Sequence, residues 1–187
     1  MKTTLIKTTM VFLFATTLLS ACKKDEVEGN DEEVITTLQL SFVPVGGGAT
    51  LSYQYDDADG PGGNAPTQDV IILSPAKTYN VTLQLLNKTA NPVENVTAEV
   101  EDEAEAHRFY YTPAAGSNIT VASLNNDANG IPLGITSTWT TGAAANGKVK
   151  ITLRHYPAVP PNKAAGDMVN DPKSGTDIEV EFVTKIQ

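Results

Sequence analysis

The segment T78-Y-N-V-T-L-Q-L-L86 alternates between apolar and polar side chains more regularly than any other part of the chain. Tyr79, Val81, Leu83 and Leu85 occupy every second position. Successive side chains of a β-strand point to opposite faces, so this period predicts a strand with one buried face. The same period recurs over residues 149–153 and 178–182.

Further short segments rich in β-branched residues lie on both sides of this strand, separated by Gly, Pro, Asn and Asp. This pattern is typical of an antiparallel sandwich. The sequence therefore predicts a mainly β, immunoglobulin-like sandwich of seven to nine strands, forming one domain over residues 34–187. The expected strands are 34–43, 49–55, 70–73, 78–86, 108–112, 119–124, 135–140, 148–155 and 178–186. The side chains expected in the core include Trp139, Leu83, Leu85, Ile151, Leu153 and Phe182.

Residues 93–107 break this pattern. Small or apolar residues recur there every three or four positions, and acids fill the positions between them. This spacing predicts one amphipathic helix lying on a sheet. A long loop is expected from Pro157 to Asp177, before the last strand.

The N-terminus has the pattern of a bacterial lipoprotein signal peptide over residues 1–21. Lys2 and Lys7 precede a short apolar run, and Leu19-Ser20-Ala21 leads to Cys22, the only cysteine. The alternatives are a plain secretory signal and a transmembrane helix, but the apolar run is shorter than the roughly 20 residues that span a bilayer. We expect lipid on Cys22 to anchor the mature chain.

Residues 22–33 are polar and strongly acidic, which predicts a flexible tether. Within it, Lys24-Asp25-Glu26 resembles the signal that sends lipoproteins of Bacteroidetes to the outer face of the outer membrane. The expected location is therefore the outer membrane, at the cell surface. An ordinary tether on a lipoprotein facing the periplasm is the alternative.

Composition narrows the classes of function. The whole chain has a formal net charge of −9, and loss of Lys2 and Lys7 with the signal peptide would make it −11. This charge disfavours nucleic acid and favours cations or basic partners. No Gly-x-Ser-x-Gly, phosphate-binding Gly-Lys-Ser/Thr or His-Glu-x-x-His motif is present, so we expect a protein that is not an enzyme.

The two histidines are candidates for a metal site. His107 ends the expected helix, four residues after Glu103, and His155 ends the strand before the long loop. If the two ends meet, Glu103, His107 and His155 could bind a divalent cation such as zinc. The alternative is that His107 stabilises the helix C-terminus and His155 is a surface residue.

Two loops are candidates for calcium binding. One carries Asp56, Asp57 and Asp59, and the other carries Asp127 and Asn129, each close to a glycine. Alternating acids before a glycine can surround a hard cation. Neither loop is an EF-hand, and Asp, Asn and Gly are also the ordinary residues of turns.

Nearly the whole mature chain resembles a family of small Bacteroidetes lipoproteins of unassigned function. The segments that carry the resemblance are EEVITTLQLSFVPVGGGATLSY, DADGPGGNAP, TYNVTLQLLNKTANPVENVTAEVEDEAEAHRFYY, DANGIPLG, ITLRHYP and TDIEVEFVTKIQ. The resemblance implies a role beside TonB-dependent outer-membrane receptors. It also implies that His107 and His155 occupy recurring motif positions of the family.

Two functions follow as hypotheses. The first is an accessory protein that captures a metal ion or a metal-bearing nutrient for an outer-membrane receptor. The second is a structural or protein-interaction module of the outer membrane that binds no small ligand.

Overall fold

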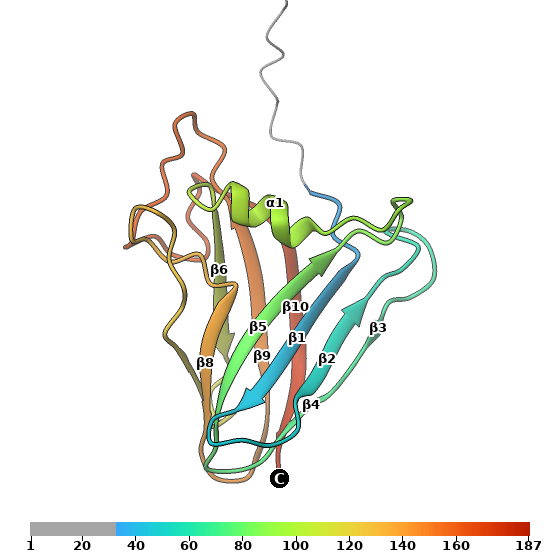
Figure 1. Cartoon of the computed structure of the whole chain (residues 1–187), viewed down its shortest axis with the longest axis vertical. Helices are drawn as coiled ribbons and strands as arrows, with labels where there is room; N and C mark the ends of the chain where they lie inside the picture. The colour runs from blue at the N-terminus through green and yellow to red at the C-terminus, as the bar shows by residue number, and fades with distance from the viewer. Residues whose placement is uncertain (1–32) are drawn as a thin grey trace, which may run out of the picture.

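The computed structural model describes residues 33–187, which form two β-sheets and one short helix (Figure 1). The signal peptide, Cys22 and most of the expected tether lie outside these residues. The elements are β1 Thr37–Pro44, β2 Leu51–Asp56, β3 Thr67–Gln68, β4 Ile71–Leu73, β5 Thr78–Leu86, α1 Val96–Asp102, β6 His107–Pro113, β7 Ile119–Ala122, β8 Thr136–Thr141, β9 Ala145–His155 and β10 Gly175–Ile186.

The two sheets have the strand orders β3-β2-β1-β5-β8-β7 and β4-β10-β9-β6. Neighbouring strands are antiparallel except β4 and β10, which are parallel. The predicted mainly β sandwich is therefore confirmed. The described residues contain ten strands rather than seven to nine, because β3 has only two residues and is too short to show an alternating pattern.

The core lies between the sheets and is formed by the alternating faces that the sequence shows. Leu38, Leu40 and Phe42 of β1 pack with the apolar positions of β5, β9 and β10. All six residues expected in the core are fully buried. Trp139 is central, with its ring 5.2 Å from that of Phe42 in an edge-to-face arrangement.

The helix is shorter than predicted. It spans Val96–Asp102 instead of 93–107 and lies across one end of the sandwich, near the start of the described chain (Figure 1). Glu94 forms an isolated antiparallel β-bridge with Asn87, and residues from His107 onward pair with β9. Sheet pairing at both flanks thus limits the helix to the residues whose buried side chains, Val96 and Val100, reach the core.

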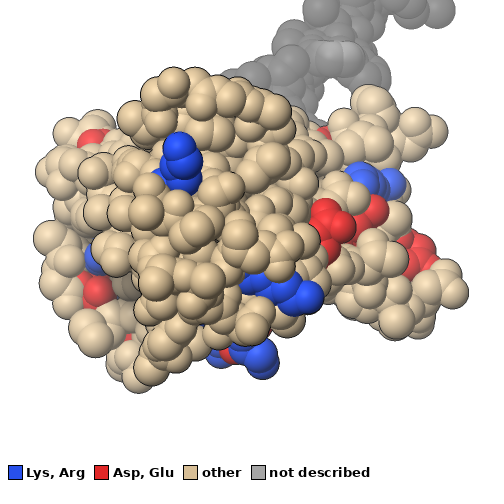
Figure 2. All heavy atoms as spheres, turned by 90° about the horizontal axis from the view of Figure 1, so that it is seen from below, with Lys and Arg blue, Asp and Glu red and all other residues tan. Residues whose placement is uncertain are grey.

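Charge is distributed unequally between the two ends of the sandwich. The loops at the end opposite α1, residues 45–50, 74–77, 114–118 and 142–144, contain no acid. Figure 2 looks onto this end and shows mostly uncharged residues. The acids of α1 and of its following turn lie at the other end. Within residues 33–187, no helix is long and apolar enough to cross a bilayer.

Candidate metal centre

The two histidines are neighbours on adjacent strands. His107 begins β6, His155 ends β9, and the antiparallel register places them directly opposite each other. Their ring centroids are 4.5 Å apart, and the residues are 0% and 8% exposed. The proximity expected from the sequence is therefore confirmed, although it comes from strand pairing and not from a helix end meeting a strand.

A β-bulge brings an acid to the histidines. The pairing of β10 with β9 shifts between Thr176 and Ile178, which leaves Asp177 as the extra residue of β10. A bulge bends its strand and redirects the side chain of the inserted residue. The Asp177 carboxylate is 1% exposed, and its Oδ2 lies 3.8 Å from Nε2 of His107. The sequence placed Asp177 at the end of a loop, whereas β10 already begins at Gly175.

The fourth member comes from the start of the described chain. Oε1 of Glu33 lies 2.9 Å from Nε2 of His107, and the Glu33 side chain is only 10% exposed. Glu33 directly precedes the segment that leads into β1 of the six-stranded sheet, whereas the other three residues belong to the four-stranded sheet. The sequence assigns Glu33 to the end of the tether, and in the structure its side chain contacts the folded domain.

The four side chains form one compact cluster of nitrogen and oxygen donors. Glu33, His107, His155 and Asp177 each offer one ligand atom, and these atoms all lie within 4.8 Å of one another. Donor atoms on one tetrahedral zinc ion, with bonds of about 2.0–2.1 Å, are about 3.3–3.4 Å apart. The 2.9 and 3.8 Å distances around His107 lie on either side of that value. Small movements would therefore bring these donors onto one ion.

The other ring nitrogen of His107 indicates which atom faces the cluster. Nδ1 lies 3.1 Å from the backbone carbonyl oxygen of Glu103. A carbonyl only accepts, so Nδ1 carries the proton and donates it there. In the neutral ring, Nε2 then has a lone pair directed toward the cluster, the arrangement typical of a metal-bound histidine.

This arrangement requires a positive charge inside the cluster. A lone pair on Nε2 and a carboxylate oxygen 2.9 Å away repel each other, unless a proton or a metal ion lies between them. The contact also lacks the alignment of an N–H···O hydrogen bond. Two further buried atoms, Oε2 of Glu33 and Nδ1 of His155, have no hydrogen-bond partner. Buried polar atoms are rarely left so, which makes them candidates for metal coordination.

The pKa shifts reflect the same balance of burial and charge. Burial alone lowers the pKa of His107, but the carboxylates of Glu33 and Asp177 raise it more, so it lies above its ordinary value. Burial likewise raises the pKa of Glu33, and His107 outweighs that effect and lowers it. The pKa of His155 is lowered by burial and then by the charge of His107. His155 is thus kept neutral, as a metal ligand must be.

The Glu103 carboxylate, which the sequence placed beside His107, is not part of the cluster. Glu103 is exposed, and it contacts His107 only through its backbone carbonyl. The helix ends before Glu103, so the helical spacing that suggested a shared face does not apply. Glu33 and Asp177 supply the carboxylates instead.

The acids of the two proposed calcium loops have other partners. Asp56 forms an ion pair with Lys88, and Asp59 accepts hydrogen bonds from the backbone and side chain of Asn64. Oδ1 of Asp127 accepts from the backbone N–H of Asn129. In the described part of the chain, neither these acids nor Asp57 belong to a group of three or more metal-ligating side chains. The loops therefore behave as turns.

Asp127 also pairs with a lysine that the sequence did not single out. Nζ of Lys163 lies 2.8 Å from Oδ2 of Asp127, and the two side chains are 1% and 0% exposed. The same ammonium donates to the carbonyls of Ala104 and His107. Lys163 therefore fixes the backbone on which His107 is mounted. Lys163 lies in the Pro-rich loop, where no sequence pattern indicates that a lysine would be buried.

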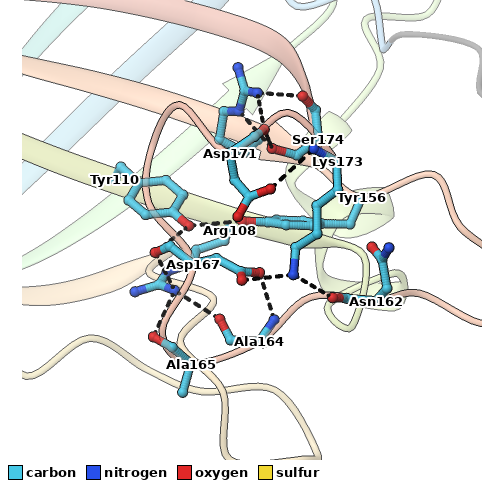
Figure 3. A network of polar contacts seen from close by, with 11 residues as sticks. Arg108, Tyr110, Tyr156, Asn162, Ala164, Ala165, Asp167, Asp171, Lys173 and Ser174 are labelled. Carbon is cyan, nitrogen blue, oxygen red and sulfur yellow. Dashed lines mark hydrogen bonds and ion pairs between the residues drawn. The ribbon is translucent and has the colours of Figure 1, made fainter.

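That loop is held against the four-stranded sheet by a polar network (Figure 3). Arg108 donates to the carbonyls of Ala164, Ala165 and Asp167, and the hydroxyls of Tyr110 and Tyr156 lie 2.8 Å apart. Lys173 forms an ion pair with Asp167. The loop is thus ordered by Arg108 and Tyr110 of β6 and by Tyr156, which directly follows β9.

The fold and the cluster define a β-sandwich domain with a buried group of two histidines and two carboxylates. Comparisons with protein-family models, with curated proteins and with solved structures found no match.

Proposed function

We propose that this protein is a lipid-anchored protein of the cell envelope that captures one divalent metal ion, zinc first, through Glu33, His107, His155 and Asp177. The observation that carries the proposal is the cluster of four donor atoms, all within 4.8 Å of one another, in which two carboxylates face Nε2 of His107. Two imidazoles and two carboxylates suit zinc and other transition metals better than calcium, which takes oxygen ligands.

The burial of the donors supports binding instead of catalysis. The side chains of His107, Glu33 and Asp177 are 0%, 10% and 1% exposed. Catalytic zinc sites keep a coordination position open for water or substrate, whereas sites with four protein ligands are closed. A closed site retains an ion and performs no chemistry on a substrate.

The distribution of charge supports capture of a cation. The acids of α1 and its following turn lie at the end of the sandwich that holds the cluster, and the loops of the opposite end carry none. A one-sided negative field raises the local concentration of cations near the site.

The cellular part of the proposal depends on the sequence. The Leu19–Cys22 pattern and the acidic residues after it support a lipid anchor at the outer-membrane surface. The resemblance to Bacteroidetes lipoproteins supports a place for this metal-binding protein beside a TonB-dependent receptor.

Zinc titration by calorimetry tests the metal proposal on residues 22–187 with Cys22→Ser. We expect one zinc per chain, and Asp177→Asn should weaken binding at least about 100-fold because it removes a ligand. Outer-shell changes alone cost 10–100-fold. The matched control is Glu103→Gln, an exposed acid near His107, which should bind like the wild type.

Equal affinity for wild type and Asp177→Asn, or no zinc binding at all, would overturn the proposal. In the latter case the second candidate applies, a protein-interaction module without a ligand. The specific observation that favours it is the 2.9 Å contact between Nε2 of His107 and Oε1 of Glu33, because a protonated imidazole could satisfy Glu33 without any metal.

A further inference from the structure

We propose that the bound metal is a clasp that closes the N-terminal segment of the domain onto the four-stranded sheet. This inference depends on the proposed function, because it assigns a consequence to the same metal site. With metal bound, the chain that leads to the anchor would leave the domain at Glu33. Without metal, residues 33–35 would be free to move.

The four ligands differ in how they are mounted. His107 and His155 are paired on neighbouring strands, and Asp177 lies in the adjacent strand of the same sheet. Those three positions are therefore set by backbone pairing within one sheet. Glu33 lies in an irregular segment before β1, which belongs to the other sheet. A metal held by all four would consequently join the two sheets.

The hydrogen bonds that secure the entering chain begin at Thr36. Its N–H donates to the carbonyl of Leu86, its hydroxyl accepts from the N–H of Lys88, and its carbonyl accepts from the N–H of Asp57. Before it, Ile35 packs partly against the core, whereas Val34 is 51% exposed. Binding of the Glu33 carboxylate to the metal would thus hold the chain on the N-terminal side of Thr36.

The clasp has a consequence for how the domain is displayed. Twelve residues, 22–33, connect the proposed lipidation site to the cluster, and at about 3.3–3.6 Å per residue they reach at most about 40 Å. With Glu33 bound, that tether starts at the metal site. With Glu33 released, it starts at Thr36, and the orientation of the domain relative to the membrane is less restricted.

Hydrogen exchange measured by mass spectrometry tests the clasp on residues 22–187 with Cys22→Ser, with and without one equivalent of zinc. We expect zinc to slow exchange at least 10-fold in the peptide covering residues 33–36. A peptide from β5, which lies in the core, serves as the internal reference and should not change.

Glu33→Gln is the informative variant, and Glu103→Gln is its matched control. With Glu33→Gln we expect weaker zinc binding and no slowing in residues 33–36, and with Glu103→Gln the wild-type result. Loss of zinc binding by folded Glu33→Gln would also support the clasp, since it identifies Glu33 as a ligand.

The possible failures are distinguishable. Absence of zinc binding by the wild type would refute the proposed function together with the clasp. Zinc binding without slower exchange in residues 33–36, or slower exchange that persists in Glu33→Gln, would refute the clasp alone.

Discussion

At the scale of single residues, the decisive side chain is His107. It is fully buried, its Nδ1 donates to a backbone carbonyl, and its Nε2 faces two carboxylates. Without a metal, protonation of the ring is what makes that environment favourable. Metal and proton therefore compete for the same nitrogen.

The first prediction concerns the pH dependence of the metal-free protein. The folded pKa of His107 is raised, so its stabilising contribution is present below its unfolded pKa of about 6.5 and is lost as pH rises through the folded value. From pH 6 to pH 9, we expect the unfolding free energy of the wild type to fall relative to that of His107→Gln, because the wild type loses the stabilising charge on His107. Urea denaturation in excess chelator measures it.

The comparison removes only the His107 imidazole, because Glu33, His155 and Asp177 remain in both proteins. The charge of His107 also lowers the pKa values of Glu33 and His155, so the difference includes the changed titration of these two neighbours. A difference that stays constant across this pH range would show that His107 does not titrate as described.

At the scale of elements, the cluster depends on a strand pair, a bulge and a loop. β6 and β9 set the two histidines opposite each other, and the bulge of β10 adds Asp177. The loop before β10 then contributes Lys163, which binds the carbonyls of Ala104 and His107. A buried ammonium in that position must be neutralised, and Asp127 does so.

The second prediction is that this ion pair is essential to the fold. Lys163→Met leaves the buried carboxylate of Asp127 uncompensated, which costs about 3–5 kcal/mol when one partner of a buried pair is removed. Denaturant unfolding measures the loss. Removing both charges, with Asp127→Asn added, should recover part of it.

The matched control is Lys148→Met. Lys148 pairs with Glu181 on the outer face of the sheet, and both side chains are about half exposed. Such exposed pairs contribute at most about 1 kcal/mol. If the two lysine variants lost equal stability, burial of the Lys163 pair would not be the cause.

At the scale of the whole molecule, the cluster, the helix and the start of the described chain lie at one end, and the C-terminus lies at the other (Figure 1). The acids of α1 and its following turn lie at the first end, while the loops of the second are uncharged apart from Lys77. Figure 2 looks onto the second end and shows mostly uncharged residues. An anchor on Cys22 would place the acidic end toward the membrane and the uncharged end away from it.

The third prediction tests this anchoring. Cys22→Ala should move the protein out of the membrane fraction or mislocalise it, because the thiol that would be lipidated is gone. Fractionation with acyl labelling measures this, and protease treatment of intact cells reports surface exposure. Wild type without an acyl label, fractionating like the variant, would contradict the anchor; complete protection from protease would indicate a periplasmic location.

The fold could be predicted from the sequence to a large extent because strand alternation is local. Leu83, Leu85 and Phe182 show their buried faces within their own strands, and the structure confirms each. The helix is predicted too long at both ends, because Glu94 forms a bridge with Asn87 and residues 103–106 form a turn, and local spacing shows neither feature.

The alternating strands, the core they form and the two histidines as candidate donors can all be recognised in the amino-acid sequence. The acids that join the histidines become apparent in the folded chain alone. Glu33 and Asp177 lie near opposite ends of the domain sequence, and neither stands in a local pattern typical of a ligand. They meet because β-sheet register, a one-residue bulge and the path of the chain into β1 converge at one end of the sandwich, and such convergence is a property of the folded chain as a whole.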